Sequence, residues 1–370
     1  MRLDREAEAA AFIADPDAAI RGLEEPVLLD EWQNAPGALG AVRRAVERDP
    51  RPGRFLVTGS VNAELDNQIW PGTGRLTRVP MYPMTVREQL GRADRPAFLD
   101  RIAAGEAPGS PPDPPDLRGY VELALRSGFP VPALQLSGRP REAWLETYLT
   151  DLLTHDVEQL EVTRTRGRDT GRLRRYFEAY ALNSAGLAED KMIYDAAGVN
   201  RITALAYEDL LERLLVAERV PPWSSNRLKR LVRQPKRYVI DPALIAAALR
   251  LDVDGVLLDG NVLGRVVESF AAAQLRPEAA VASTRPRLHH LRTKEARQEV
   301  DLVIELAGHR LIGIEVKADS APGRQAARHL AWLRDSYDTE FVVGVVLHTG
   351  PGAFEIEDRI LAVPIAALWA

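Results

Sequence analysis

The amino-acid sequence predicts an α/β protein with more than one domain. In the first 90 residues, short apolar runs alternate with amphipathic stretches, which is typical of a parallel sheet whose strands are joined by helices. A similar alternation returns from Gly264 to the C-terminus. A chain of 370 residues is also long for a single hydrophobic core. We therefore expect two α/β units with a mainly helical region between them.

The N-terminal strands are predicted at Val27–Leu29, Phe55–Val57 and 76–81, where apolar residues cluster. Residues 105–117, GEAPGSPPDPPDL, follow, and their prolines cannot sustain a helix or a central strand. We interpret this segment as a linker or lid loop. The next residues, up to about 185, have apolar positions at helical spacing and a run of arginines.

The segment DAAGVNRITALAYEDLLERLL predicts two helices separated at Gly198 and Asn200. Residues 219–239 then read as a two-stranded wing, so we expect a winged-helix-like unit. Four apolar residues should form the buried side of its second helix: Ile202, Leu205, Leu210 and Leu214. In the C-terminal part, a helix should lead into strands at 289–292, 299–304 and 311–316, followed by a helix and a strand at 341–347.

Composition excludes several classes of protein. The chain has no cysteine, so a disulfide, a thiolate nucleophile and a cysteine-based zinc site are excluded. No stretch approaches the roughly 20 apolar residues that span a bilayer, and the N-terminal MRLDREAEAA is too charged for a signal peptide. We expect a cytoplasmic protein without a membrane partner. The net charge of -5 argues against a globally basic nucleic-acid binder.

Two carboxylates follow the first predicted strand directly, in PVLLDEWQNAP. Asp30 could hold the Mg²⁺ of a nucleotide, and Glu31 could polarise the attacking water as the catalytic base. A solvated strand end is the alternative interpretation. Thr58 and Ser60 follow the second strand, where polar groups could contact a phosphate, and Arg75 could serve a neighbouring subunit.

The segments LLDEWQNAP, GRFLVTGSVN, GRLTRVPMYPMTVRE and RSGFP together resemble a predicted AAA+ ATPase family of bacteria and archaea that has a tail domain of unknown function. The resemblance covers nearly the whole chain. It implies ATP and Mg²⁺ as cofactors and self-association through the ATPase core. In that family, a strand and a GxxxxGK[ST] loop come before the segment LLDEWQNAP.

No GxxxxGK[ST] loop occurs among the 370 residues. The backbone N–H groups and the lysine of that loop supply most of the phosphate affinity, so we expect weak nucleotide binding. Either the start of the gene is placed too late or the ATPase core is degenerate. The predicted fold is thus an incomplete AAA+ P-loop-type parallel sheet, then a winged helix, then a restriction-endonuclease-like α/β domain. We expect boundaries at 1–104 for the ATPase core, 105–185 for the linker and lid, 186–250 for the winged helix and 251–370 for the nuclease-like domain.

The predicted wing is rich in basic residues, which favours sequence-independent contact with the backbone of DNA or RNA. The residues assigned to this contact are Arg227, Lys229, Arg230, Arg233, Lys236 and Arg237. A charged surface that only contacts water, or a packing module between domains, is the alternative. Acidic residues on the preceding helix argue against sequence-specific reading.

The tail sequence EVDLVIELAGHRLIGIEVKA resembles the PD-(D/E)xK nuclease core. Glu315 and Lys317 are two apart in one strand and share a face, and Asp301 lies in the preceding strand. With Glu268 from the preceding helix, the acidic groups could hold Mg²⁺ or Mn²⁺ while Lys317 acts as the catalytic lysine. The alternative is a buried salt bridge between layers. The rival to the enzyme hypothesis is a non-enzymatic regulatory or interaction protein that uses both α/β units as scaffolds.

Overall fold

The computed structural model describes residues 1–59, 74–156, 170–226, 234–293 and 297–370. The chain divides into two compact units, which we call unit 1, Met1–Val79, and unit 2, Pro80–Ala370. The division falls at Val79 rather than at the predicted boundary of 104/105. Residues 80–116 belong to unit 2 because they pack on it: Asp100 Oδ1 accepts a hydrogen bond from Thr284 Oγ1 at 2.7 Å, and Arg310 donates to the carbonyl of Ala103 at 2.5 Å.

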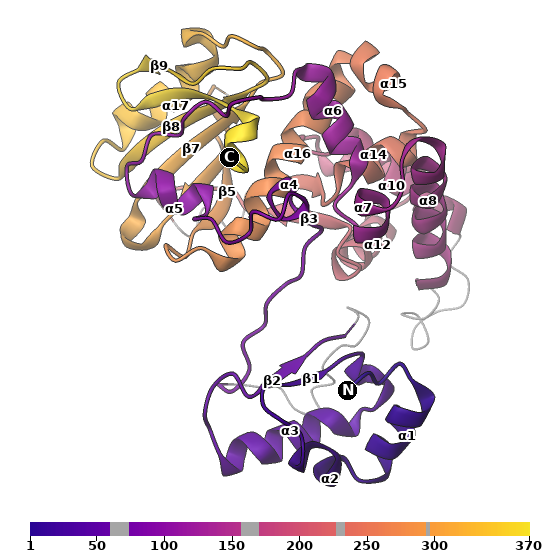
Figure 1. The fold of residues 1–370 in the computed structure, drawn as a ribbon. Coiled ribbons are helices and arrows are strands. Elements are labelled where there is room, and N and C mark those ends of the chain that lie inside the picture. The colour runs from indigo at the N-terminus through magenta and orange to yellow at the C-terminus, as the bar shows by residue number, and fades with distance from the viewer. Residues whose placement is uncertain (60–73, 157–169, 227–233, 294–296) are drawn as a thin grey trace. The chain divides into compact units, whose positions relative to one another are not determined.

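Unit 1 is a small α/β layer (Figure 1). Its elements are α1 (Glu6–Ala14), α2 (Pro16–Arg21), β1 (Val27–Leu29), η1 (Trp32–Asn34), α3 (Gly37–Arg48) and β2 (Phe55–Val57). β1 and β2 pair in parallel, and α3 supplies the crossover that parallel neighbours require. The first two predicted strands are therefore confirmed. The predicted strand at 76–81 is wrong, since this segment has no regular structure and Pro80 cannot donate a ladder hydrogen bond.

The core of unit 1 lies on one face of this two-stranded sheet. Leu29 and Val27 point into it and pack with Leu39 of α3. The residues between them alternate to the other face, as side chains of a strand must. Leu28 and Leu56 are register partners there and are 46% and 56% exposed.

Unit 2 begins with a mainly helical part. Its helices are α4 (Val86–Gln89), α5 (Phe98–Ala103), α6 (Leu117–Arg126), α7 (Pro130–Leu134), α8 (Gly138–Asp151), η2 (Leu152–Asp156), α10 (Thr170–Leu182), α11 (Asp190–Ala197), α12 (Arg201–Arg213), α14 (Pro242–Leu249), α15 (Val253–Leu258) and α16 (Gly260–Val281). Among the described residues, no helix has both the length and the apolar character that crossing a bilayer requires.

A helix pair and a hairpin lie where the winged-helix-like unit is predicted. Gly198 ends α11 with φ 66°, and the Asn200 side chain caps α12 by accepting from the Thr203 N–H at 2.9 Å. β3 (Ala217–Val220) and β4 (Lys236–Val239) pair antiparallel. The predicted buried face of α12 is wrong in part, because Ile202 is 82% exposed and Leu205 is 43% exposed.

The C-terminal part of unit 2 is a six-stranded mixed sheet (Figure 1). Its strands are β5 (Arg287–Arg292), β6 (Glu299–Glu305), β7 (Leu311–Val316), β8 (Phe341–His348), β9 (Phe354–Glu357) and β10 (Ile360–Pro364). The order is β5-β6-β7-β8-β10-β9, with β7, β8 and β10 parallel. Short 3-10 helices lie at Ala307–His309 and Ile365–Leu368.

Helices cover both faces of this sheet. Leu302 and Ile314 pack with the apolar side of α16, whereas Val303 and Leu311 pack with Leu330 of α17 (Arg324–Ser336). Every residue of β7 is buried, as expected for a central strand between two helical layers. The strands predicted in this region are confirmed.

Candidate functional site

The carboxylate of Asp30 and the hydroxyl of Thr58 meet at one edge of the sheet of unit 1. Thr58 Oγ1 donates to Asp30 Oδ1 at 2.7 Å, because each residue directly follows one of two paired parallel strands. The backbone holds this arrangement, since the Thr58 N–H donates to the Leu29 carbonyl at 2.9 Å. The Asp30 side chain remains 36% exposed, and Arg2 Nε lies 4.0 Å from its Oδ2. The edge therefore offers hard oxygen donors to solvent.

The other residues predicted around this edge are placed differently. Glu31 has a left-handed backbone with φ 56°, and its Oε2 accepts a hydrogen bond from Gln33 Nε2. Arg75 pairs with Glu47 of α3 at 3.1 Å, so its guanidinium is bound within unit 1. Ser60 lies outside the described residues.

In unit 2, the acidic residues of the predicted metal site lie around Lys236, a residue that the sequence predicts to contact nucleic acid. Lys236 Nζ lies 2.5 Å from Oε1 of Glu268 and 3.1 Å from Oδ1 of Asp301. Lys317 Nζ lies 2.7 Å from Oε2 of Glu315 and 3.9 Å from Oδ2 of Asp301. Three elements of the predicted nuclease core and β4 thus contribute to one cluster, which we call the buried charge cluster.

The fit of a divalent cation to this cluster is poor. Among the described residues, no group of three or more His, Asp and Glu side chains has a geometry that could hold a metal ion. Lys236 is only 1% exposed and lies against both Glu268 and Asp301. The predicted metal role of Glu268, Asp301 and Glu315 is therefore not supported, because two lysine ammonium groups already contact these carboxyl groups.

Burial and neighbouring charges shift the pKa values of the carboxyl groups in the cluster. Burial raises the pKa of Glu268 to about 7, and the nearby Asp301 carboxylate adds to this rise. Burial also raises the pKa of Glu315 well above its usual range. Burial alone would raise the pKa of Asp301, but Lys236 and Lys317 hold it below its usual value. The two lysines thus favour the ionised form of Asp301 most strongly.

Two of the residues assigned to nucleic-acid contact are buried. Arg237 is 3% exposed, donates to Glu208 Oε1 at 2.7 Å and pairs with Asp190. Lys236 belongs to the buried charge cluster. Their assignment to a nucleic-acid surface is wrong, since both cations face carboxylates inside unit 2. Arg227, Lys229, Arg230 and Arg233 lie outside the described residues.

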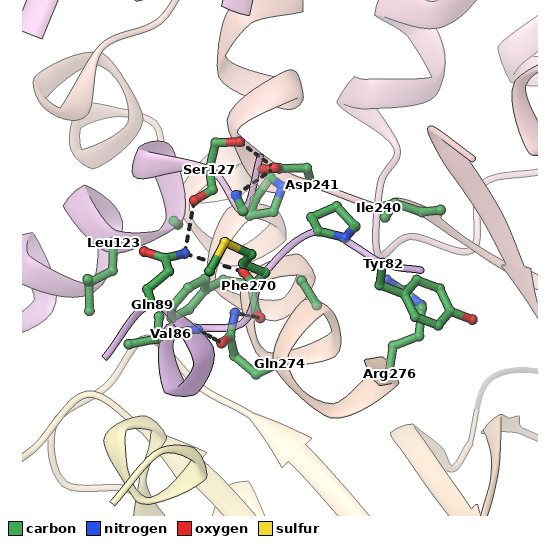
Figure 2. Close-up of a pocket in the computed structure, with 16 residues that line it drawn as sticks. Tyr82, Val86, Gln89, Leu123, Ser127, Ile240, Asp241, Phe270, Gln274 and Arg276 are labelled. Carbon is green, nitrogen blue, oxygen red and sulfur yellow. Dashed lines mark hydrogen bonds between the residues drawn. The ribbon is translucent and has the colours of Figure 1, made fainter. Parts of the chain in front are cut away.

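A small cavity in unit 2 is lined by residues from two of the segments that carry the family resemblance (Figure 2). Residues of MYPMTVREQ and RSGFP line it together with Asp241 and Gln274. Asp241 Oδ2 accepts from Ser127 Oγ at 2.6 Å and from the Gly128 N–H at 2.9 Å. Gln274 Oε1 accepts from the Val86 N–H at 2.7 Å.

The cavity volume is about 20 Å³, which is room for roughly one water molecule. The segments therefore join α6, α14 and α16 and do not form a ligand pocket. Sequence reasoning missed Asp241 and Gln274. An aspartate before a proline at the start of a helix, as in Asp241–Pro242, was the available signal for a capping side chain.

Comparison with known proteins adds three family matches. Residues 2–90 match an AAA domain, residues 117–255 a domain of unknown function (DUF8612), and residues 263–368 a second domain of unknown function (DUF4143). The first and last of these matches support an AAA-like ATPase family. The AAA-domain match includes Asp30, Glu31 and Thr58 and continues past Val79 into the start of unit 2.

Two relatives have sequences that match most of this chain. They are uncharacterized proteins of Mycobacterium bovis and Mycobacterium tuberculosis, each 29% identical over 357 residues. The matched region covers 96% of this chain and 72% of each relative. No solved structure matches the chain.

Proposed function

We propose that the protein is an AAA-type nucleotide-binding protein whose unit 1 contacts the Mg²⁺ and phosphates of ATP. The observation that carries this proposal is the 2.7 Å hydrogen bond between Thr58 and Asp30 at the carboxyl ends of two parallel strands. Ligands of α/β sheets bind at that edge, and carboxylate oxygens are preferred Mg²⁺ ligands. Asp30 would hold the ion, Thr58 orients Asp30, and Glu31 is the candidate base for the attacking water.

The affinity for ATP should be low. No phosphate-binding GxxxxGK[ST] loop is present in the sequence, and that loop normally provides backbone N–H groups and a lysine to the phosphates. Asp30 and Glu31 therefore act on a ligand that few other groups hold. We expect weak, Mg²⁺-dependent binding without measurable turnover.

Titration of the full chain with a fluorescent ATP analogue, with and without Mg²⁺, tests this proposal. Asp30→Asn should remove the Mg²⁺-dependent part of the binding, and Thr58→Val should weaken it. Thr77→Val is the matched control, since Thr77 is an exposed threonine of the same unit. Tight Mg²⁺-dependent binding of the ATP analogue would contradict the expected low affinity. Binding that is unchanged in Asp30→Asn would contradict the assignment of Asp30 to the nucleotide site.

We also propose that unit 2 contains a winged-helix-like module associated with DNA or RNA. The order of α11, α12 and the β3–β4 hairpin supports this. Reversing the charge of Arg227, Lys229 and Arg230 should abolish a salt-dependent affinity that does not discriminate sequence. Lys191→Glu is the control because Lys191 is an exposed lysine on α11. Unchanged binding in the triple variant would refute the proposal.

A second candidate function is a non-enzymatic scaffold, in which unit 2 has a nuclease-like fold without nuclease chemistry. The observation that favours it is the buried charge cluster, in which Lys236 and Lys317 form ion pairs with the acidic residues. Incubation of the full chain with single- and double-stranded DNA and RNA, with Mg²⁺ or Mn²⁺, should give no cleavage. Cleavage that is lost in both Asp301→Ala and Lys317→Ala would favour the nuclease instead.

A further inference from the structure

The place that a metal ion would take between Glu268 and Asp301 is filled by a side chain from another part of unit 2. Lys236 comes from β4, which pairs with β3 and lies outside the six-stranded sheet. Its Nζ contacts Glu268 Oε1 at 2.5 Å and Asp301 Oδ1 at 3.1 Å. The lysine side chain is almost completely buried, so water does not separate the ammonium from these carboxylates.

Two further donors contact these carboxylates. Tyr238 donates to Glu268 Oε1 at 2.7 Å, and the Val316 N–H donates to Asp301 Oδ2 at 3.0 Å. A magnesium or manganese ion requires about six oxygen ligands at short distances. Such an ion would have to displace these donors, and its two positive charges would repel the neighbouring ammonium in a poorly hydrated site.

We infer that Lys236 is the permanent counter-ion of Glu268 and Asp301 and excludes divalent metal ions from this site. The ammonium has three N–H donors, so it can donate to both carboxylates, and its single positive charge balances one of them. Lys317 pairs with the third carboxyl group of the cluster, that of Glu315, at 2.7 Å. Helix α16 and the C-terminal sheet of unit 2 therefore hold this acidic cluster with lysine partners and without metal.

Mn²⁺ binding to the full chain, without nucleotide, tests this inference by electron paramagnetic resonance of free Mn²⁺ and by calorimetry. Wild type should show no saturable Mn²⁺ binding at this site. Its Mn²⁺ titration should therefore match that of Asp301→Asn. Lys236→Met should gain a Mn²⁺ site, and the double variant Lys236→Met/Asp301→Asn should lose it. Lys317→Met is the matched control, because it removes the other lysine of the cluster and retains Lys236.

Wild-type Mn²⁺ binding that Asp301→Asn abolishes would overturn the inference, as would a folded Lys236→Met chain that binds no more Mn²⁺ than wild type. The comparison of wild type with Asp301→Asn needs no Lys236 variant, so it can overturn the inference even where Lys236→Met does not fold. A Mn²⁺ site at Asp30 in unit 1 would survive Asp301→Asn. The outcome is therefore separate from that of the proposed nucleotide site.

Discussion

Lys236 Nζ and Glu268 Oε1 lie 2.5 Å apart, and their contact joins the β3–β4 hairpin to the long helix α16. Asp301 of β6 completes the connection at 3.1 Å. A buried cation that contacts two carboxylates cannot leave without exposing uncompensated charge. The hairpin and the C-terminal sheet are thus linked by charge as well as by apolar packing.

Lys236→Met should lower the free energy of unfolding of unit 2 by about 3–5 kcal/mol, because the variant leaves buried carboxylates without their counter-ion. Denaturant unfolding followed by circular dichroism measures this loss. Lys191→Met, which removes an exposed lysine paired with Asp195, should have little effect. Equal effects of the two substitutions would show that the burial of Lys236 does not matter to stability.

Gly128→Ala should destabilise unit 2 by about 1–3 kcal/mol, the usual cost of forcing extra atoms into a packed core. A Cβ at Gly128 would lie 2.5 Å from the Met84 carbonyl oxygen and 2.7 Å from Cβ of Pro83. Thermal unfolding measures the change. Gly109→Ala is the control, since a Cβ there meets no atom within 4 Å, and a similar loss in both variants would contradict the packing argument.

Acid should destabilise the protein partly through His290. Burial, together with the charge of Lys236, lowers the pKa of His290 to about 4 from its ordinary 6.5. Because the unfolded chain takes up the proton first, the stability contributed by the neutral ring is complete above pH 6.5 and is lost as the pH falls toward 4. Between these limits, wild type should lose on the order of 2–3 kcal/mol relative to His290→Gln.

Unfolding of wild type and His290→Gln at pH 7 and pH 4.5 measures this difference. The glutamine amide can still donate to the Gln234 carbonyl, which His290 Nε2 contacts at 3.1 Å. His309→Gln, at an exposed position, controls for the loss of a histidine as such. Parallel pH profiles of wild type and His290→Gln would exclude His290 as the source of acid sensitivity.

Thr58→Val should destabilise unit 1 by about 1 kcal/mol, the net contribution of a typical hydrogen bond, because Asp30 Oδ1 loses its donor at 2.7 Å. Hydrogen exchange of the β1 and β2 amides reports on unit 1 separately from unit 2. Faster exchange is expected in Thr58→Val and not in the exposed control Thr77→Val. Unchanged protection of β1 would mean that solvent replaces the Thr58 hydroxyl without cost.

The local elements, and the contacts that follow from strand geometry, could be predicted from the amino-acid sequence alone. Apolar runs defined β1, β2, β6 and β7. Asp30 and Thr58 could be expected to meet, because residues that follow neighbouring parallel strands share an edge. Glu315 and Lys317 could be expected on one side, because side chains two apart in a strand share a face.

The burial of particular charged residues could not be predicted from local sequence and follows from the folded arrangement of unit 2. Lys236 and Arg237 stand in a basic stretch of sequence that resembles a solvated wing, and no local pattern shows that their partners lie on distant elements. The proline-rich residues near 110 likewise read as a linker, yet Ser110 Oγ accepts from the Ala353 N–H at 2.6 Å in unit 2. Burial of a charge depends on partners brought together by folding, and hydrophobic periodicity does not encode those partners.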